Sequence, residues 1–535
     1  MPNGAQIILE CLIEQGVDTV FGYPGGQTLG IYDALYNEKR IRHILTSSEA
    51  GAAHAADAYA RVSGKTGVCI ATSGPGATNL VTGIATAYMD SSAVVFITGN
   101  VPLGRIGTDS FQEVDITGIT IPITKHNVMV KSADELASAI RFAFEAAGEG
   151  RPGPVLVDVP RDVQERLCEF TPPVSGDKPP EARAVSVREI EEAVSLIDSA
   201  EMPLLLCGGG VIRSGAAEAV ERLAEGLNIP VATTVMGLGA LPSSHRLNLG
   251  FCGVHGSREA NSALDRCDLV IAVGVRFSDR IMEPGNRRKR ILHIDIDRSE
   301  INKNVPAEKK IVGDAGAVLD RLADSCERRG RRLWEEKREK EEKPGRGRGV
   351  KPRDLKLIRQ LFGEDLCVAT DVGQHQMWAA QYIGAEKPGR FLTSGGMGTM
   401  GFGLGAAVGA QLALPGSRVV LVTGDGSFKM NSAELYTVSR NKLPIITVIM
   451  NNGTLGMVRQ QQKQSCGGRY SQTGLEGNPD FALLARAYGV DGYTAATAEQ
   501  LESALAAAKE SGGAAVINCL VDIDETVRTR RARKD

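Results

Sequence analysis

The sequence predicts an α/β protein built from three doubly wound domains with parallel sheets. Short β-branched runs recur along its 535 residues. They end in Gly, Asp or Asn and lead into segments with helical periodicity, which is typical of parallel sheets. At roughly 150 residues per domain, the length suggests about three or four domains. The strand-like runs are TGVCIAT (66–72), AVVFITG (93–99), PVLVDVP (154–160), PLLLCGGG (203–210), DLVIAVG (268–274), RILHIDID (290–297), SRVVLVTGDG (417–426) and LPIITVIMNN (443–452).

Two polar segments divide the chain. The first, 171–186, is rich in proline, and the second, around 326–353, is a charged run that ends in a Gly/Arg-rich stretch. Acidic residues match the basic ones in the helical part of the second segment, which favours a solvated linker over a nucleic-acid-binding arm. The expected units are therefore 1–165, 187–328, a charged linker at 329–350, 351–520 and a basic tail at 521–535.

Composition and charge exclude several classes of protein. Hydrophobic residues make up 42% and charged residues 23% of the chain, which rules out a largely disordered protein. The net charge of −3 creates no global field for nucleic acid or an anionic membrane. The N-terminus has no basic n-region and the stretch 395–414 is glycine-rich, so we expect neither a signal peptide nor a membrane span. Ten cysteines without a C-x-x-C pair indicate reduced thiols in a cytoplasmic protein.

The strongest chemical signal lies in the third unit. GDGS (424–427) follows one strand-like run and NN (451–452) ends the next. Both motifs should therefore lie at the carboxyl edge of a parallel sheet, where ligands bind. A carboxylate, an amide oxygen and a main-chain carbonyl suit Mg²⁺, and the glycines let backbone N–H groups approach a diphosphate. An isolated Asp-Gly is also an ordinary turn, but this spacing between two strands resembles the signature of thiamine-diphosphate (ThDP) enzymes.

A carboxylic acid for the other end of ThDP is found in the first unit. It must lie beside N1′ of the aminopyrimidine, where it promotes loss of the proton from C2 of the thiazolium. In ThDP enzymes it is a Glu at the end of a strand, and here Glu49 follows RHILT (42–46) at the start of an Ala-rich helix. For an isolated Glu, a place in the first turn of a helix capped by Ser47 or Ser48 would be sufficient explanation. Together with the motif in the third unit, Glu49 becomes the expected acid.

From about residue 5 to 500 the chain resembles the catalytic large subunits of the acetolactate synthase (acetohydroxyacid synthase) family. Several matching motifs are shared by all ThDP decarboxylases and ligases, whereas TDVGQHQMWAAQ together with FQEVD and HIDID is more particular to the synthases. The motifs are YPGG (23–26), SEAGAAHAADAYAR (48–61), TSGPGATN (72–79), GTDSFQEVDI (107–116), GRPGPVLVDVP (150–160), GVRFSDR (274–280), HIDIDRSEINKN (293–304), TDVGQHQMWAAQ (370–381), SGGMGTMGFGLGAAVGAQ (394–411) and NNGTLGMVRQ (451–460).

The resemblance implies a fold, an activity and partners. The domains would be, in order, pyrimidine-binding, FAD-binding and diphosphate-binding. The activity would be decarboxylation of pyruvate on ThDP and ligation to a second 2-keto acid, giving 2-acetolactate or 2-aceto-2-hydroxybutyrate in branched-chain amino acid (isoleucine and valine) biosynthesis. The cofactors would be ThDP, Mg²⁺ and FAD. The protein would be a cytoplasmic homodimer or tetramer with shared active sites, and assembly with a small regulatory subunit stays open.

The resemblance also assigns ThDP and metal contacts to individual residues. Mg²⁺ would be bound by the side chains of Asp425 and Asn452 and the carbonyl of Thr454. In the same domain the cofactor would be held by Val372, Gly373, Gln374, His375, Gly398, Met400, Gly426, Ser427, Gly456 and Met457. Met400 would support the thiazolium against the pyrimidine, its flexible thioether filling the bend. The other subunit would contribute Tyr23, Pro24, Gly25, Pro75, Asn79 and the catalytic residues Glu49 and Gln112.

The middle unit looks like a dinucleotide-binding fold, although it has no G-x-G-x-x-G. CGGG (207–210), GVHG (253–256) and HIDID (293–297) supply glycines and acidic residues at strand ends. The resemblance supplies the ligand, FAD, although the family usually reads R-F-D-D-R where this chain has Ser278 in R-F-S-D-R. The implied FAD contacts are Arg151, Gly208, Gly209, His255, Gly274, Arg276, Asp295, Asp314 and Gln376.

Two further departures from the family pattern bear on specificity. Gln461 stands where the family usually has a Trp that favours 2-ketobutyrate and anchors herbicides, so the preferred second substrate is open and low herbicide sensitivity is expected. The family's Pro-rich closing tail is absent, so closure over the site is expected to differ. Another ThDP-dependent 2-keto acid decarboxylase or an FAD-dependent pyruvate oxidase shares the scaffold and stays an alternative. A non-enzymatic relative is a third, against which the intact Glu49, Asp425 and Asn452 argue.

Overall fold

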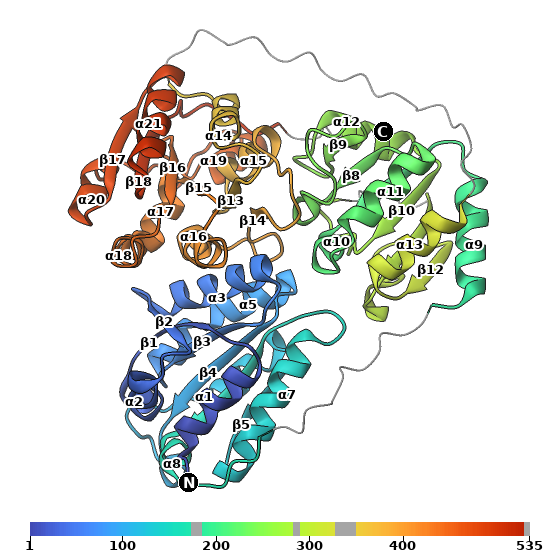
Figure 1. Ribbon diagram of the computed structural model, residues 1–535. Coiled ribbons are helices and arrows are strands. Elements are labelled where there is room, and N and C mark those ends of the chain that lie inside the picture. The colour runs from blue at the N-terminus through green and yellow to red at the C-terminus, as the bar shows by residue number, and fades with distance from the viewer. Residues whose placement is uncertain (173–184, 282–288, 327–348, 529–535) are drawn as a thin grey trace.

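The computed structural model describes residues 1–172, 185–281, 289–326 and 349–528 (Figure 1). They form three α/β domains, each around a six-stranded sheet whose strand pairs are all parallel, as predicted. Figure 1 shows the first domain in blue, the middle domain in green and the third in orange and red, arranged as a triangle. Most of the expected linker at 329–350 lies outside the described residues.

The first domain has the strand order β2-β1-β3-β4-β6-β5. Its central strands are buried along their whole length, which explains their continuous apolar sequences. Helix α3 begins after Ser48, whose side chain accepts from the amide of Gly51, and ends at Gly64 in the left-handed region (φ +73°). The elements are α1 (Gly4–Glu14), β1 (Thr19–Tyr23), α2 (Leu29–Asn37), β2 (Arg42–Leu45), α3 (Glu49–Ser63), β3 (Gly67–Ala71), α4 (Pro75–Asn79), α5 (Val81–Asp90), β4 (Val94–Asn100), α6 (Ile116–Thr120), β5 (His126–Met129), α7 (Leu136–Gly148), β6 (Val155–Pro160) and α8 (Arg161–Glu165).

The middle domain has the strand order β12-β11-β10-β7-β8-β9. This is the 3-2-1-4-5-6 order of dinucleotide-binding folds read from the opposite edge. Its first helix starts with a capping box between Ser186 and Glu189 and turns Ile190 and Ile197 into the core. The elements are α9 (Val187–Asp198), β7 (Pro203–Cys207), α10 (Gly209–Arg213), α11 (Ala217–Leu227), β8 (Val231–Thr233), β9 (Asn248–Phe251), α12 (Arg258–Arg266), β10 (Leu269–Val273), β11 (Arg290–Asp295), β12 (Lys309–Val312) and α13 (Ala315–Ser325).

The third domain has the strand order β14-β13-β15-β16-β18-β17, the same pattern as the first. The glycine-rich stretch at 395–414 is a loop followed by a buried helix. The elements are α14 (Lys356–Phe362), β13 (Cys367–Thr370), α15 (Gln374–Tyr382), β14 (Phe391–Leu392), α16 (Phe402–Ala413), β15 (Val419–Gly424), α17 (Asp425–Asn431), α18 (Leu435–Arg440), β16 (Ile446–Asn451), α19 (Gly456–Ser465), α20 (Phe481–Ala487), β17 (Asp491–Ala495), α21 (Ala498–Ser511) and β18 (Ala515–Leu520).

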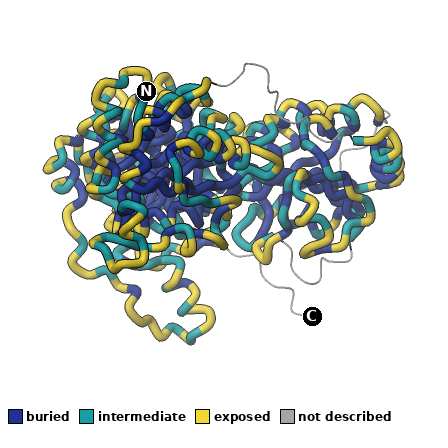
Figure 2. Tube along the Cα trace, turned by 90° about the horizontal axis from the view of Figure 1, so that it is seen from below, coloured by how far each residue is buried: buried dark blue, intermediate teal, exposed yellow. Residues whose placement is uncertain are grey.

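Helices α3 and α16 join the first and third domains. A Cβ on Gly409 would lie 2.0 Å from the carbonyl oxygen of Ala55, so the two helices approach too closely for larger residues. The rings of His54 and Phe402 meet edge to face at 5.3 Å. A single hydrophobic cluster therefore runs through both domains. The buried residues fill the interior and the exposed ones follow the outer loops in Figure 2. None of the helices in the described ranges has the length and apolar character needed to cross a bilayer.

Candidate active site

An open pocket lies at the carboxyl edge of the third sheet. The segments that follow β13 and β15 meet there, at the point where the strand order reverses, which is where α/β sheets bind ligands. The pocket gathers the residues that the sequence predicted for diphosphate and metal in this domain, with the exception of Gly398. Its lining residues are Val372, Gly373, Gln374, His375, Trp378, Met400, Gly424, Asp425, Gly426, Ser427, Met450, Asn452, Thr454, Leu455, Gly456, Met457 and Val458.

Glycines and a buried histidine shape one side of this pocket. A Cβ on Gly424 would lie 2.8 Å from Nδ1 of His375, and one on Gly426 would lie 2.8 Å from Leu455. Nε2 of His375 is buried and has no hydrogen-bond partner, and burial lowers the pKa of His375 to about 3. A buried ring nitrogen normally has a partner. The first turn of α15, which begins after Gly373 without a side-chain cap, presents backbone amides that fit an anionic ligand such as a diphosphate.

The predicted metal ligands converge on the other side of the pocket. Asp425 starts α17, and burial raises the pKa of its carboxyl group although Asn478 opposes that shift by donating to Oδ2 at 2.7 Å. Asn452 follows β16; its Oδ1 accepts from the amide of Thr454 at 3.3 Å and its Nδ2 donates to Gln374 at 3.0 Å. In the described ranges no group of three or more His, Cys, Asp and Glu side chains could hold a metal. One carboxylate with amide and carbonyl oxygens fits Mg²⁺ completed by phosphates.

Asn478 is a site residue that the sequence analysis missed. It lies in the loop before α20 and connects Asp425 with Lys429, whose Nζ donates to Oδ1 of Asn478 at 2.7 Å. It also contacts Asn451, at 3.4 Å. No motif marks it, because a loop brings it to the sheet edge from a distant position in the chain. Its amide orients the Asp425 carboxylate.

Met400 lies where two backbone contacts fix the chain. Asp371, at the end of β13, is buried and accepts from the amides of Gly401 and Gly403 at 2.8 and 2.9 Å. Gly398, two residues before Met400, has φ +73°, and a Cβ there would lie 4.0 Å from Val372. Gly398 is thus next to the pocket although it does not line it. A thioether at this position can fill an irregular space beside a ligand.

In the first domain, Glu49 lies in a group of predicted site residues at the carboxyl edge of the sheet. Nδ2 of Asn79 donates to Oε2 of Glu49 at 3.0 Å. A Cβ on Gly76 would lie 3.2 Å from Oε1 of Glu49, and a Cβ on Gly74 would lie 2.8 Å from Gln112. Gln112 has φ +62°, a left-handed conformation that costs a non-glycine residue energy and is found most often at functional sites. Glu49, Pro75, Asn79 and Gln112 therefore form one group.

The loop of Tyr23, Pro24 and Gly25 belongs to the same edge. Thr72 is the residue that holds it, because its Oγ1 accepts from the amide of Gln27 at 3.1 Å and its Cγ2 would lie 2.4 Å from a Cβ on Gly25. Glu434 of the third domain is a second contact that the sequence did not reveal. Its Oε1 accepts from the amides of residues 47 and 48, each at 3.0 Å, and so fixes the strand-to-helix turn just before Glu49.

The third-domain pocket and the first-domain group around Glu49 differ in how far they are enclosed within one chain. All the residues that line the pocket come from the third domain. Tyr23, Pro75 and Asn79 of the first domain are exposed, and Glu49 and Gln112 are half-buried. The first-domain group therefore faces solvent, and its functional side chains can meet a ligand held by another surface.

The middle domain brings several of the predicted FAD residues to its own switch point, between β7 and β10. A Cβ on Gly208 would lie 2.0 Å from the carbonyl oxygen of Gly274, which has φ +60°. The carbonyl of Gly209 accepts from Arg213 at 3.0 Å. Such close backbone packing after the first strand is what a dinucleotide-binding turn requires.

Charged residues surround this turn. Arg151 reaches over from the first domain, donating to Glu300 at 2.8 Å and to Ser91 at 2.8 Å. Burial raises the pKa of Asp295 to about 6. Arg276 is half-buried near both, and burial lowers the pKa of its guanidinium, an effect that Arg151 reinforces. The two arginines place positive charge beside the turn, where an anionic ligand could pair with it.

Three of the predicted FAD residues have other contacts. Asp314 caps α13 by accepting from the amide of Ala317 at 3.0 Å. The carbonyl of His255 accepts from Gln381 at 2.9 Å. Gln376 donates to Thr393 at 2.7 Å within the third domain. No contact described for them joins these three side chains to the turn at Gly208.

The segment 521–528 lies against the third domain beside the pocket. Gln460 makes two bonds with the backbone of Val527, at 2.8 and 2.9 Å. Gln374 donates to the carbonyl of Glu525 at 2.9 Å, and the same Gln374 accepts from Asn452. The first part of the expected basic tail is thus bonded to residues of the site, and 529–535 lie outside the described residues.

Comparison with known proteins agrees with this geometry. Three family models match: the N-terminal TPP binding domain (residues 2–119), the central domain (190–322) and the C-terminal TPP binding domain (371–519) of thiamine pyrophosphate enzymes. The chain is 44% identical to a probable acetolactate synthase large subunit of Methanocaldococcus jannaschii, over 98% of this chain and 93% of that protein. It is 44% identical to the acetolactate synthase isozyme 2 large subunit of Escherichia coli (98% and 96%) and 45% identical to a large subunit of Corynebacterium glutamicum (95% and 85%).

Proposed function

Since the chain belongs to the acetolactate synthase large-subunit family of thiamine pyrophosphate enzymes, we propose that it decarboxylates pyruvate on ThDP and ligates the remaining two-carbon unit to a second 2-keto acid. The products are 2-acetolactate and 2-aceto-2-hydroxybutyrate, as branched-chain amino acid biosynthesis requires. The observation that carries the proposal is the pocket that joins His375, Asp425 and Asn452, in a chain that also places Glu49 at the edge of a matching sheet.

The third domain would hold the diphosphate and its metal. His375 offers an unpartnered buried nitrogen, and Asp425 and Asn452 with the Thr454 carbonyl offer oxygen ligands for Mg²⁺. The bound ThDP supplies an electron sink, which makes loss of CO₂ from a 2-keto acid feasible. Met450, Leu455 and Met457 give the pocket wall apolar side chains, and apolar surroundings disfavour a substrate carboxylate relative to CO₂.

Glu49 would hold and move the proton that the reaction needs. Its Oε2 is engaged by Asn79, which leaves Oε1 free for a ring nitrogen. Gly76 keeps that oxygen accessible, because any larger residue would crowd it. Gln112, held in a left-handed conformation in the same group, supports substrate or cofactor at this edge.

We propose that two chains complete each active site. The group around Glu49 and the pocket around Asp425 belong to different domains, and Glu49 and its neighbours face solvent within one chain. Large apolar side chains near Gln112 are exposed, with Phe111 83% and Ile121 67% accessible. Apolar surface of this kind beside a half-site is typical of an interface. A homodimer, or a tetramer made of two such dimers, satisfies both observations.

FAD is proposed for the middle domain. The support is the dinucleotide-binding strand order and the glycine turn at Gly208 and Gly274, together with the nearby Arg151, Arg276 and Asp295. A purified protein that keeps a yellow flavin spectrum after desalting supports the assignment. A colourless protein that takes up no added FAD contradicts it.

The finer proposals concern substrates, location and partners. Gln461 is exposed on α19, and competition between pyruvate and 2-ketobutyrate in one assay measures the preference directly. The relatives from M. jannaschii and E. coli are named large subunits, so we include a small regulatory subunit as a partner, to be tested by co-purification. We place the enzyme in the cytoplasm, where free thiols stay reduced; nine of its ten free cysteines are buried.

The decisive experiment is incubation of the purified chain with ThDP, Mg²⁺ and pyruvate, followed by analysis of the products. We expect acetolactate, and none in the matched reaction without Mg²⁺. Acetaldehyde as the only product would indicate a decarboxylase, and hydrogen peroxide with oxygen uptake would indicate a pyruvate oxidase. Either result contradicts the proposal.

A further inference from the structure

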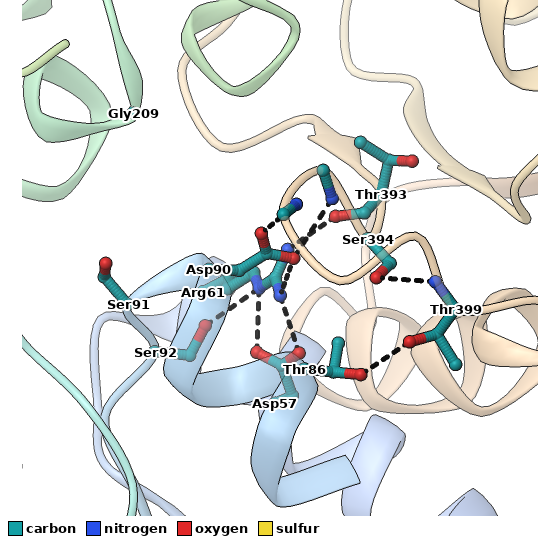
Figure 3. Close-up of polar contacts among 12 residues, drawn as sticks. Asp57, Arg61, Thr86, Asp90, Ser91, Ser92, Gly209, Thr393, Ser394 and Thr399 are labelled. Carbon is teal, nitrogen blue, oxygen red and sulfur yellow. Dashed lines mark hydrogen bonds and ion pairs between the residues drawn. The ribbon is translucent and has the colours of Figure 1, made fainter. Parts of the chain in front are cut away.

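Helix α5 of the first domain contacts the loop of residues 393–401, which we name the support loop because it carries Met400 (Figure 3). Oγ1 of Thr86 lies 2.7 Å from Oγ1 of Thr399, and both residues are buried. The backbone just after Met400 is held from the other direction by Asp371. Met400 therefore lies between one residue that the first domain fixes and one that the third domain fixes.

A second contact lies one helical turn further along α5. The carboxylate of Asp90 accepts from the amide of Gly395 at 3.1 Å and from the amide of Gly396 at 2.7 Å. A Cβ on Gly396 would lie 2.9 Å from Oδ1 of Asp90, so only glycine permits this approach. Thr86 and Asp90 are four residues apart and share one face of the helix. The helix thus fixes the support loop both at its start and just before Met400.

The charge of Asp90 is balanced inside the protein. Asp57 binds Arg61 through two bonds of 2.6 and 2.7 Å, and Arg61 donates to Asp90 at 3.0 Å and to the carbonyl of Thr393 at 2.8 Å (Figure 3). Burial opposes the charge of Arg61, but the two carboxylates raise its pKa above the ordinary value. Arg61 therefore stays charged and pairs with both carboxylates.

The middle domain fixes the end of the same helix. Arg213 donates to the carbonyl of Asp90 and, at 2.7 Å, to the carbonyl of Ser91. Its guanidinium is buried, which lowers the pKa of Arg213 to about 10. The end of α5 is thereby held by all three domains, and a fixed helix end gives the support loop a rigid partner.

We propose that Thr86 and Asp90 are positioning residues, which hold the support loop in the conformation that places Gly398 and Met400 against the cofactor. The proposal rests on the proposed function, because it assumes ThDP in the pocket. It gives the first domain two separate tasks: α5 supports the pocket of its own chain, and Glu49 serves the pocket of the partner.

The hydroxyl contact is tested with Thr86→Val, which keeps the shape and removes the bond. Binding of ThDP with Mg²⁺ is measured by quenching of the fluorescence of Trp378, which lines the pocket. We expect affinity about 10-fold weaker, as for one buried hydrogen bond left unmade. Thr86→Ser, which keeps the hydroxyl, is expected to bind as the unmodified protein does. Thr82→Val, at an exposed position of the same helix, is the matched control.

The carboxylate contact is tested in the cofactor-free protein by hydrogen exchange. In Asp90→Asn we expect the amides of residues 395 and 396 to exchange about 10-fold faster, because an amide side chain offers one acceptor where the carboxylate offers two. The amides of β15 are expected to be unchanged. Asp33→Asn removes the same charge from an exposed position of α2 and serves as the control.

Three outcomes overturn the inference. One is unchanged ThDP affinity in Thr86→Val together with unchanged exchange in Asp90→Asn. Another is loss of ThDP affinity in Thr86→Val only in proportion to a lowered unfolding midpoint, with no rescue by Thr86→Ser. The third is failure of the unmodified protein to bind ThDP, which also overturns the proposed function. A protein that binds ThDP but makes no acetolactate contradicts the proposed function alone.

Discussion

The first and third domains have the same strand order, yet their switch points look different. In the third domain a glycine-lined pocket encloses the buried His375 and Asp425. In the first domain the corresponding edge carries the exposed Tyr23 and Asn79 and the half-buried Glu49. The comparison teaches that one strand order supports two arrangements: the third domain forms a pocket by itself, and the first leaves its side chains on an open edge, which we propose serves the pocket of a partner chain.

The loops that follow the strands explain this difference. In the third domain α17 starts at the residue after β15 and α15 starts shortly after β13, and their first turns line the pocket together with the glycines around them. In the first domain the strand β3 is followed by the short helix α4, which begins at Pro75 after Gly74 in a left-handed conformation. That turn brings Glu49, Asn79 and Gln112 together on an open surface.

Glu49→Gln is expected to have the largest effect. Removing the proton-holding carboxyl group should lower kcat by a factor of about 10² to 10⁴, since this is the usual contribution of general acid–base catalysis. ThDP affinity should stay within a few-fold, because the third domain holds the diphosphate. Steady-state kinetics measure kcat, and Trp378 fluorescence measures the ThDP affinity separately. Glu145→Gln, exposed on α7, is the control, and full activity of Glu49→Gln would remove the role given to the first domain.

Asp425→Asn is expected to act mainly on the affinity for the cofactor, whereas Glu49→Gln acts on kcat. A neutral amide binds Mg²⁺ more weakly, so the affinity for ThDP with Mg²⁺ should fall by about 100-fold, which corresponds to loss of one charged ligand contact. Excess Mg²⁺ should restore part of kcat. Titration calorimetry with Mg²⁺ and ThDP measures the change, with the exposed Asp491→Asn as control. An unaltered Mg²⁺ requirement would show that the metal binds elsewhere.

A pair of glycine substitutions sharpens the comparison. A Cβ on Gly76 would lie 3.2 Å from Oε1 of Glu49, and a Cβ on Gly426 would lie 2.8 Å from Leu455 at the pocket wall. Gly76→Ala should therefore lower kcat and Gly426→Ala should raise the KM for ThDP, each by about 10-fold, as for strain of about 1.4 kcal/mol. The same pattern of kcat and KM in both variants would argue against a division of tasks.

The last prediction concerns stability at acid pH and leaves the active site untouched. Burial, with a further contribution from Arg61, lowers the pKa of His54 to about 4 at the contact of α3 with α16. Because the unfolded chain binds this proton below about 6.5 and the folded one does not, stability should be lost as the pH falls from about 6.5 to 4.

His54→Asn tests this statement, since asparagine does not titrate. Between pH 7 and 4.5 its unfolding free energy should fall by about 2 kcal/mol less than that of the unmodified protein. Denaturant unfolding at several pH values gives the numbers, and the exposed His126→Asn provides the comparison. Parallel pH profiles for His54→Asn and the unmodified protein would contradict the prediction.

Much of the fold could be predicted from local sequence. The run 93–99 became β4 (Val94–Asn100) and the run 268–274 became β10 (Leu269–Val273), because continuous apolar β-branched stretches suit strands buried on both faces. The start of α3 at Glu49 followed from its serine cap. The strand orders could not be predicted, since they depend on contacts between distant segments. The shared order of the first and third sheets therefore emerged only in the structure.

The same distinction holds for the site. Asp425 and Asn452 could be predicted because each ends a strand of the same sheet. Asn478, Glu434 and Thr86 could not, because each reaches its partner across a loop or between domains without any motif. Their roles follow from tertiary packing, which a single sequence does not reveal.

The central claim, that each active site combines Glu49 of one chain with the pocket of another, is tested most directly by mixing two inactive variants. Glu49→Gln and Asp425→Asn chains, dissociated together and reassembled, form mixed dimers in which one site has both intact groups. The account predicts that acetolactate formation returns to about a quarter of the unmodified activity, because about half of the dimers are mixed and one of their two sites is whole. Mixtures that stay as inactive as the separate variants would contradict it.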